Sequence, residues 1–597
     1  MSRILPNSSL PRTLWLLLVV AIGWTAAQLW GLRFNNHDDI YFHLSGFQFA
    51  GDYLAFAREV AIKQARLQAF LNMPLTVWAL SFSNTWFYDV ILVLPFLLLC
   101  GALAFYLGAL GNIREGLALT SMSLLLFPLH SYFTFPQGYP IMGPLGLLTG
   151  LLAGVLLSQY LTKQKKIWLG LSIGAFALSL VGAEYNVVLH PVLLGLIVWA
   201  HQPRNVRTAA FALAPFAIVW IITIGCYAGF SIFARAQGAD LDGRVSMGFN
   251  LGAYLETFQR LTERAFLPLG LVRGITFTST PDVNKPAVLS VLSYSNLVTN
   301  YLSRTSLVLT CIGASILWIL FLRGGRISRT NSLRYLAAFL ALTTIPTAVV
   351  SASSHYQTIV TKGYLQGHLV SFYTQLGLNS ICILVGQFAS WIPSRKIYRR
   401  ALWFLTTTLF AACFTYTFAY NVLNRATMLA NQQRWPAVEL LAAYLKIERP
   451  ELATRTVVAP ALWNTSGVAN IPSWENMYDK NYWRAYSSMV LRQEINFVRK
   501  DEPSTKHPIF FWYQTTANGE PVLGLAENAT PAEKCQVTFI SRNPAQGGDL
   551  FGALPAIAPL SSKIDWVCKD ICYLTVSVLQ SCESILPFPT ATSDNFN

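Results

Sequence analysis

The chain has 597 residues, of which 53% are hydrophobic and only 12% are charged, and its formal net charge is +15. Soluble globular proteins carry about 25% charged residues, so the composition excludes an ordinary soluble domain and favours lipid-embedded helices. The positive charge does not indicate a nucleic-acid partner, because the basic residues form short clusters between apolar runs, as in loops on one side of a membrane.

Eleven apolar runs are predicted to be membrane helices, since a spanning helix needs about 20 mostly apolar residues. The sixth run is short and almost continuous with the fifth, so this pair is either a tight helical hairpin or a kinked segment. The predicted spans are 14–32, 89–110, 116–133, 141–161, 167–183, 187–200, 209–230, 303–322, 335–350, 371–392 and 401–422.

The charges of the loops predict the orientation. If the N-terminus is inside, the inner loops contain many basic residues and a single acid, Glu115. The basic residues are Arg3, Arg12, Arg114, Lys163, Lys165, Lys166, Arg204, Arg207, Arg323, Arg326, Arg329, Arg334, Arg395, Lys396, Arg399 and Arg400. This asymmetry follows the positive-inside rule. We therefore expect a multi-pass protein of a bacterial inner membrane with a cytoplasmic N-terminus and, because the number of spans is odd, an extracytoplasmic C-terminus.

Two domains are expected on this topology. A transmembrane domain covers 1–422 and includes the outer loops 33–88, 231–302 and 351–370, and an extracytoplasmic domain covers 423–597. The second domain alternates short apolar stretches with turn residues, which predicts a small mixed α/β domain. Its predicted elements are a helix near 433–447 and strands near 454–459, 508–513 and 535–541.

Four of the nine cysteines lie in the C-terminal domain, at Cys535, Cys568, Cys572 and Cys582. In an exported domain these residues are candidates for one or two disulfides. The sequence does not decide among the three full pairings, and the alternative is four free thiols in a cytosolic tail.

An adjacent pair of acids, Asp38 and Asp39, follows the first span directly, in the sequence NNHDDIY at 35–41. Like charges so close raise the pKa of one carboxyl or require a cation nearby, and acids at the end of a membrane helix are costly. Such a pair is a candidate functional site. The alternative is a solvated helix end whose acids are adjacent by chance.

A helix is predicted over 52–70, between the acid pair and the second span. Arg58, Glu59, Lys63 and Arg66 supply its polar positions. A helix of this kind lies in the membrane interface instead of crossing the bilayer. Its apolar positions include Phe56, Val60, Leu67 and Phe70.

The order of these features resembles the GT-C superfamily of glycosyltransferases, and in particular its bacterial members that use polyprenyl-phosphate sugars. The shared features are a first membrane helix, an Asp-Asp pair at the start of the first outer loop, interfacial helices, about ten further spans and a C-terminal outer domain. The resemblance implies inverting transfer in which Asp38 or Asp39 acts as general base on an acceptor hydroxyl, or helps to hold a divalent metal such as Mg²⁺ or Mn²⁺.

A second acid occurs in a later outer loop of many GT-C members. Here the second outer loop, 131–140, contains none, which weakens a metal-dependent mechanism. Glu184, in the sequence GAEYN at 182–186, is the candidate substitute and needs a partner at membrane depth. The alternative is a hairpin-turn acid that reaches headgroup water.

The donor that the resemblance implies needs cations for its phosphate. Lys362 is favoured because the surrounding segment, 354–368, is dense in His, Tyr, Gln and Lys, which bind sugars through hydrogen bonds and stacking. Arg304 begins a span where it would meet a lipid phosphate. The alternatives are an interfacial belt for the first and snorkelling for the second. The candidate donor-binding residues are Lys362, Arg304, His355, Tyr356, Tyr364 and Arg58.

The expected activity is transfer of a sugar from a polyprenyl phosphate to an envelope glycan, such as lipopolysaccharide, or to another lipid acceptor. Neither a His-Glu-x-x-His motif nor a nucleotide-binding glycine motif occurs, so zinc chemistry and nucleotide use have no support. Two other classes stay open. A polymerase or ligase for lipid-linked glycans would depend on Arg235, Arg244 or Arg273, and a transporter or flippase would show internal repeats, which the sequence lacks.

Overall fold

The computed structural model divides the chain into two compact units, Met1–Ala426 and Thr427–Asn597. The residues that the structure describes are 11–32, 43–44, 52–82, 85–129, 141–201, 206–239, 248, 250–265, 298–299, 302–324, 327–361, 370–388, 396–432, 434–459, 462, 481–498, 509–515, 521–527, 534–542, 567–568 and 571–581.

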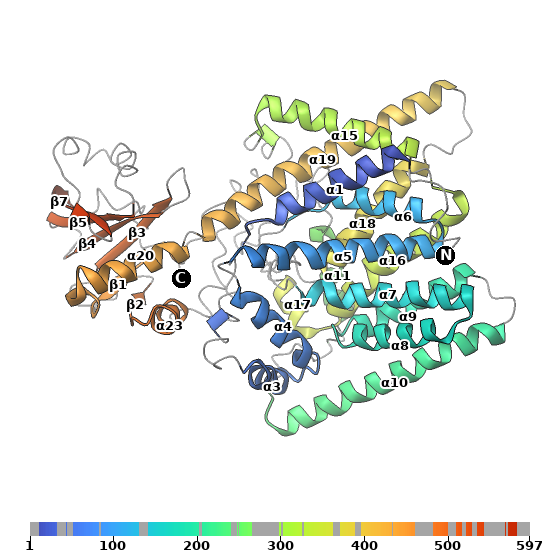
Figure 1. Ribbon diagram of the computed structural model, residues 1–597, viewed down its shortest axis with the longest axis horizontal. Helices are drawn as coiled ribbons and strands as arrows, with labels where there is room; N and C mark the ends of the chain where they lie inside the picture. The colour runs from blue at the N-terminus through green and yellow to red at the C-terminus, as the bar shows by residue number, and fades with distance from the viewer. Residues whose placement is uncertain are drawn as a thin grey trace. The chain divides into compact units, whose positions relative to one another are not determined.

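The first unit is a bundle of helices (Figure 1). Seven of them, α1, α5, α7, α10, α15, α16 and α19, are long and apolar enough to cross a membrane, so the protein is a mostly helical, polytopic membrane protein. The helices are α1 (Arg12–Leu29), α3 (Tyr53–Gln64), α4 (Ala69–Ser81), α5 (Trp86–Leu110), α6 (Ile113–Leu125), α7 (Met142–Lys163), α8 (Lys166–Leu180), α9 (Asn186–His201), α10 (Val206–Ala236), α11 (Leu251–Ala265), α15 (Arg304–Gly324), α16 (Arg329–Ser351), α17 (Ser354–Thr361), α18 (Ser371–Phe388) and α19 (Lys396–Gln432).

The other four predicted spans coincide with helices that are shorter or more polar. Helices α8 and α9 have 15 and 16 residues and form a hairpin that packs against α7, which decides between the two readings of that pair. Helix α18 has 18 residues but buries polar side chains that include Gln375 and Gln387. The count of eleven spans therefore stays a prediction.

Helix α6 is shorter than the predicted span 116–133 because side-chain amides replace its next backbone hydrogen bonds. The Asn379 amide donates to the carbonyl of Leu126 at 2.9 Å, and the Asn421 amide donates to that of Phe127 at 3.0 Å. The amide oxygen of Asn421 accepts from the backbone N–H of Leu129 at 2.7 Å. Backbone groups in a membrane must be satisfied internally, so these two asparagines allow the helix to end at Leu125 inside the bundle.

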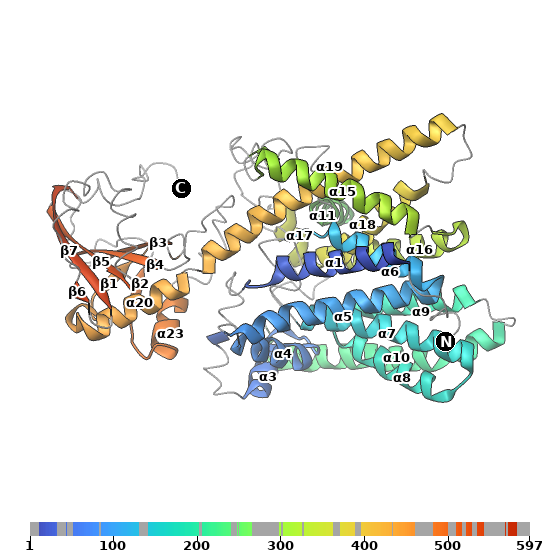
Figure 2. The ribbon, with the colours of Figure 1, turned by 45° about the horizontal axis from the view of Figure 1, so that its top comes forward.

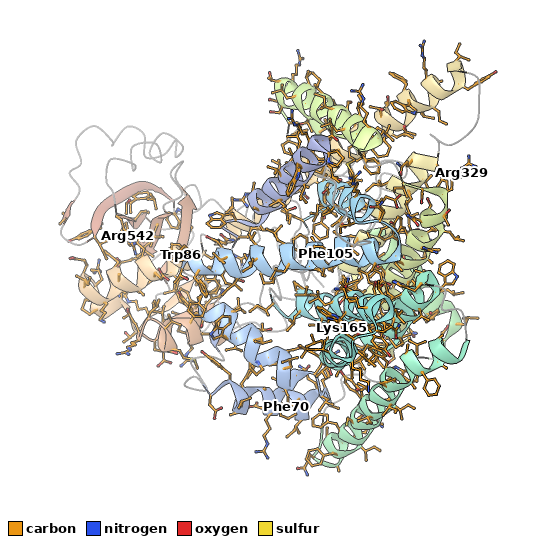
Figure 3. All side chains as sticks on the ribbon, turned by 45° about the vertical axis from the view of Figure 1, so that its right-hand side comes forward. Phe70, Trp86, Phe105, Lys165, Arg329 and Arg542 are labelled. Carbon is orange, nitrogen blue, oxygen red and sulfur yellow. The ribbon has the colours of Figure 1, made fainter. Side chains whose placement is uncertain are left out.

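The turns that carry basic clusters lie at one end of this bundle. In Figures 1 and 2, the α5–α6, α7–α8 and α15–α16 turns lie at the right, and α3, α4 and α17 lie toward the other end. Arg329 and Trp86 mark the two ends in Figure 3. The charge asymmetry predicted from the sequence is thus an asymmetry between the two ends of the bundle.

A buried acid joins two helices at the end of the bundle that has the basic turns. The Glu115 carboxylate accepts hydrogen bonds from the Ser328 backbone N–H at 2.8 Å, from the Asn331 amide at 2.7 Å and from the Tyr335 hydroxyl at 2.7 Å. These donors come from the start of α16, whose first N–H groups lack partners within the helix. Glu115 therefore joins α6 to α16 and is not a solvated loop acid.

The second unit is a mixed sheet with helices. Its seven strands have the order β2-β1-β3-β4-β5-β7-β6, with β1 parallel to β2 and β3 and the remaining pairs antiparallel. Helix α20 packs against β4 and β5. The elements are α20 (Arg434–Ile447), η2 (Pro450–Leu452), β1 (Thr456–Val458), α23 (Asn481–Met489), β2 (Asn496–Val498), β3 (Ile509–Thr515), β4 (Pro521–Glu527), β5 (Lys534–Ser541), β6 (Val567–Cys568) and β7 (Cys572–Ser581).

The predicted helix near 433–447 and the three predicted strands are confirmed as α20, β1, β3 and β5. The sequence did not predict helix α23 or strands β2, β4, β6 and β7. A bidentate ion pair connects the end of α20 to the sheet. Arg449, which follows α20, binds both oxygens of Glu527 on β4 at 3.0 and 3.1 Å. The Glu527 side chain is only 7% exposed, so this charge depends on its partner.

The backbone register favours one disulfide. Cys568 and Cys572 are direct cross-strand partners of β6 and β7. Such partners have Cα atoms about 4.5–5.5 Å apart, within the range of about 4.4–6.8 Å that a disulfide spans. We expect mass spectrometry of the non-reduced protein to recover a Cys568–Cys572 linkage. Peptides that show both residues as free thiols would contradict this pairing. Cys582 lies outside the described residues, and the side chains of Cys535, Cys568 and Cys572 are not described, so this pairing is inferred from the backbone register alone.

Candidate functional site

The predicted interfacial helix is two helices, separated by a break. Helix α3 ends at Gln64 because Ala65 adopts a left-handed conformation, with φ 53°, which is a common helix stop. Phe56 and Val60 are buried as expected, but Phe70 belongs to α4 and is 38% exposed, so a single helix over 52–70 is wrong.

Glu184 lies in the α8–α9 turn, and the chain segment after that break supplies its partners. The Arg66 Nε atom lies 3.3 Å from Glu184 Oε1, with the two side chains 23% and 45% exposed. The Gln68 amide donates to the same oxygen. One turn later, the Asn72 amide donates to the Gly182 carbonyl at 2.7 Å. The segment that joins α3 to α4, together with the first turn of α4, is therefore bound to the α8–α9 turn around an ion pair.

Tyrosines surround this pair. The ring of Tyr185 lies 5.0 Å from the ring of Tyr373 on α18, and Glu184 and Tyr356 of α17 are close enough to interact with Tyr185 electrostatically. Burial raises the pKa of Tyr185 well above its ordinary value, and Tyr373 and Glu184 raise it further. Tyr185 thus stays a neutral phenol that can donate a hydrogen bond. We call Arg66, Gln68, Glu184, Tyr185 and Tyr356 the Glu184 cluster.

The candidate donor-binding residues divide between this cluster and other places. Tyr356 belongs to it, and the ring of His355 lies 5.2 Å from that of Tyr356. Arg58 is exposed on α3. Arg304 begins α15, which packs against α1 and α6 and not on the cluster's helices. The remaining two, Lys362 and Tyr364, lie outside the described residues.

The acid pair also lies outside the described residues, but the chain is anchored on both sides of it. Upstream, the Gly31 backbone N–H donates to the Asp89 carboxylate at 2.9 Å. Downstream, buried His43 bonds through Nδ1 to the Leu80 carbonyl of α4 at 3.2 Å. Burial lowers the pKa of His43, although the bond to Leu80 opposes this shift. A neutral imidazole that donates to the carbonyl agrees with both facts.

The sequence did not predict the pairing of Arg66 with Glu184 or the roles of Gln68 and Asp89. Arg66 is one of several cations in the outer loops, and only the break at Ala65 distinguishes it from Lys63 nearby. Asp89 stands at the start of an otherwise apolar run, and an acid in such a position was a usable signal, because it is costly unless it has a partner.

The described residues do not favour a metal. Across the described ranges, no group of three or more His, Cys, Asp or Glu side chains is placed to hold an ion. Glu184 is engaged by a guanidinium and an amide donor, an environment that fits an ion pair better than a divalent cation. We therefore assign no step to a metal.

Comparisons with known proteins do not identify a family. No protein-family model matches the chain, and a search of curated proteins finds no match. The chemistry of the Glu184 cluster and of the anchored segment between α1 and α4 is therefore the basis for assigning a function.

Proposed function

We propose that this protein is an inverting glycosyltransferase that moves a sugar from a polyprenyl phosphate to an extracytoplasmic envelope glycan or lipid, with a GT-C-like transmembrane domain. One observation carries the proposal. A guanidinium, a carboxylate and two tyrosines meet in the Glu184 cluster, at the end of the bundle where the loop with Asp38 and Asp39 begins. Polar groups of these types recognise phosphate and sugar hydroxyls.

The chain length limits how far the acids can lie from this end. An extended chain advances at most about 3.6 Å per residue, so Asp39 lies within about 14 Å of the Cα atom of His43. His43 is bound to Leu80, near the C-terminal end of α4, and the Gly31 N–H is bound to Asp89 before the acids. These two anchors support the proposal that Asp38 and Asp39 act at this end of the bundle.

The reaction follows from these groups. The carboxylate of Asp38 or Asp39 takes the proton from an acceptor hydroxyl while the hydroxyl oxygen attacks the anomeric carbon of the donor sugar. The bond from that carbon to the phosphate oxygen breaks, and polyprenyl phosphate leaves with the electron pair, so one displacement inverts the configuration. The Arg66 guanidinium is suited to the charge that develops on the leaving phosphate.

The same proposal fixes the orientation. The end of the bundle with the basic turns is cytoplasmic by the positive-inside rule, and the Glu184 cluster and the second unit are extracytoplasmic. A lipid-linked donor suits this arrangement, because it is reached from the outer leaflet without a nucleotide-binding domain. The membrane is a bacterial inner membrane.

The role of Arg66 can be tested with a matched control on the neighbouring helix. A charged hydrogen bond contributes about 1.5–3 kcal/mol, so Arg66→Ala should raise KM for a polyprenyl-phosphate sugar by about 10- to 100-fold. Lys63→Ala removes the same charge from an exposed side chain that pairs with Glu59, and it should leave KM within about twofold. Both are measured as release of polyprenyl phosphate in membranes that contain the native acceptor.

Other results would favour other functions. An equal KM for Arg66→Ala and the unsubstituted protein would remove Arg66 from the donor site. Loss of activity on substitution of Arg235 at the end of α10, with both first-loop acids dispensable, would indicate a polymerase or ligase of another fold.

A further inference from the structure

The C-terminal end of α1 is bound by an arginine that lies near the end of the first unit in sequence. Arg425 of α19 donates from Nη1 to the Gln28 carbonyl at 2.8 Å and from Nη2 to the Trp30 carbonyl at 2.7 Å. Carbonyls at a helix C-terminus lack partners within the helix, and a cation there is favoured by the helix dipole. Arg425 therefore caps α1 directly before the first outer loop.

A buried acid completes this cap from another helix. Asp89, in the first turn of α5, is 4% exposed and accepts from the Gly31 N–H at 2.9 Å. Gly31 has φ 77°, a left-handed conformation that favours glycine. Arg425 therefore binds a carbonyl of this turn and Asp89 binds its N–H, and the Asp89 carboxylate opposes the lowering of the Arg425 pKa that burial causes.

Helices α1 and α19 also pack through apolar contacts that do not involve Asp89 or Arg425. The ring of Trp24 on α1 packs 5.5 and 5.2 Å from the rings of Phe414 and Phe418 on α19. Burying an acid and confining an arginine is costly compared with apolar packing. What the charged groups add is control of one turn, at Trp30 and Gly31, which lies seven residues before Asp38.

We propose that Asp89 and Arg425 are positioning residues, which fix the direction in which the chain leaves α1 and thereby place the acid pair for proton transfer. This role rests on the proposed function for its catalytic part only. The orientation of the turn is a separate, physical claim.

If Asp89 and Arg425 position the acid pair, their substitution should lower kcat and leave KM nearly unchanged. Misplacing a reacting group by about 1 Å costs about 100-fold in rate, so Arg425→Ala should lower kcat by about 10- to 100-fold, while the KM for the polyprenyl-phosphate sugar changes by less than about twofold. Arg425→Lys keeps the charge but loses the planar fork, and it should recover part of the loss. Arg400→Ala, at the other end of α19, is the matched control and should leave kcat unchanged.

The effect of Asp89 and Arg425 on the turn after α1 can be measured without an activity assay. In amide hydrogen exchange of the full-length protein, a peptide covering 28–32 should exchange at least about tenfold faster in Arg425→Ala and Asp89→Ala than in the unsubstituted protein or in Arg400→Ala. Asp89→Asn keeps an acceptor for Gly31 and should give a smaller increase. Unchanged exchange in both alanine variants would overturn the positioning role.

These measurements distinguish failure of the positioning role from failure of the proposed function. Faster exchange at 28–32 with no transfer by any form of the protein would remove the proposed function and leave the cap as an anchor of the loop. Faster exchange with an unchanged kcat would remove the positioning role while the proposed function stands. A raised KM with an unchanged kcat would assign these residues to donor binding and would also contradict the proposal.

Discussion

Replacement of the catalytic base should lower turnover by about 100- to 10,000-fold, the range that general base catalysis contributes. We expect this loss in Asp38→Asn or in Asp39→Asn, whichever acid is the base, because an amide cannot accept the proton of the acceptor hydroxyl at neutral pH. The variant should still bind the donor, since its substitution leaves the Arg66 side chain intact. The measurement is the initial rate of polyprenyl phosphate release at saturating donor.

The matched control is Asp52→Asn, in the same outer loop. The exposed Asp52 carboxylate caps α3 by accepting from the Ala55 N–H at 3.0 Å, and asparagine caps helices equally well. Its rate should stay within about twofold of the unsubstituted protein. Full activity in both Asp38→Asn and Asp39→Asn would show that neither acid is the base.

The largest loss of stability is expected at Glu115. In Glu115→Ala, the Ser328 N–H, the Asn331 amide and the Tyr335 hydroxyl all lose an acceptor, and each unsatisfied buried polar group costs about 1–3 kcal/mol. We expect the free energy of unfolding to fall by about 3 kcal/mol or more, measured by SDS denaturation of the purified protein. Because Glu115 lies at the opposite end of the bundle from the Glu184 cluster, the KM of the folded fraction should not change.

A graded series separates this network from general disruption of the fold. Tyr335→Phe removes one donor to Glu115 and the acceptor of the Asn112 N–H, and it should cost about 1–2 kcal/mol. Glu115→Gln, which keeps one acceptor oxygen, should also cost less than Glu115→Ala. If all three variants unfold within about 0.5 kcal/mol of the unsubstituted protein, the Glu115 network does not hold α6 to α16.

The sequence predicted what is local. Apolar runs indicated the helices, and alternation with turn residues indicated α20, β1, β3 and β5. The length of α6 was not predictable in this way, because it depends on Asn379 and Asn421, which are distant in sequence. The break at Ala65 was missed because periodicity continues through it and because alanine carries no signal for a left-handed conformation.

The partners in the site were harder to predict because they are pairs of distant residues. Gln68 and Glu184 are 116 positions apart, and Arg425 and Gln28 are 397 apart. The need of Glu184 for a partner at membrane depth was predictable from its charge, but the identity of Arg66 was not. Charge shows that a partner is required, and only the fold shows which one is present.

The most direct measurement uses the purified protein in right-side-out vesicles, with a radiolabelled polyprenyl-phosphate sugar and envelope glycan supplied on the extracytoplasmic side. We expect polyprenyl phosphate to be released and the label to enter the glycan with inverted anomeric configuration. Recovery of the labelled donor unchanged, on either side of the membrane, would contradict this expectation.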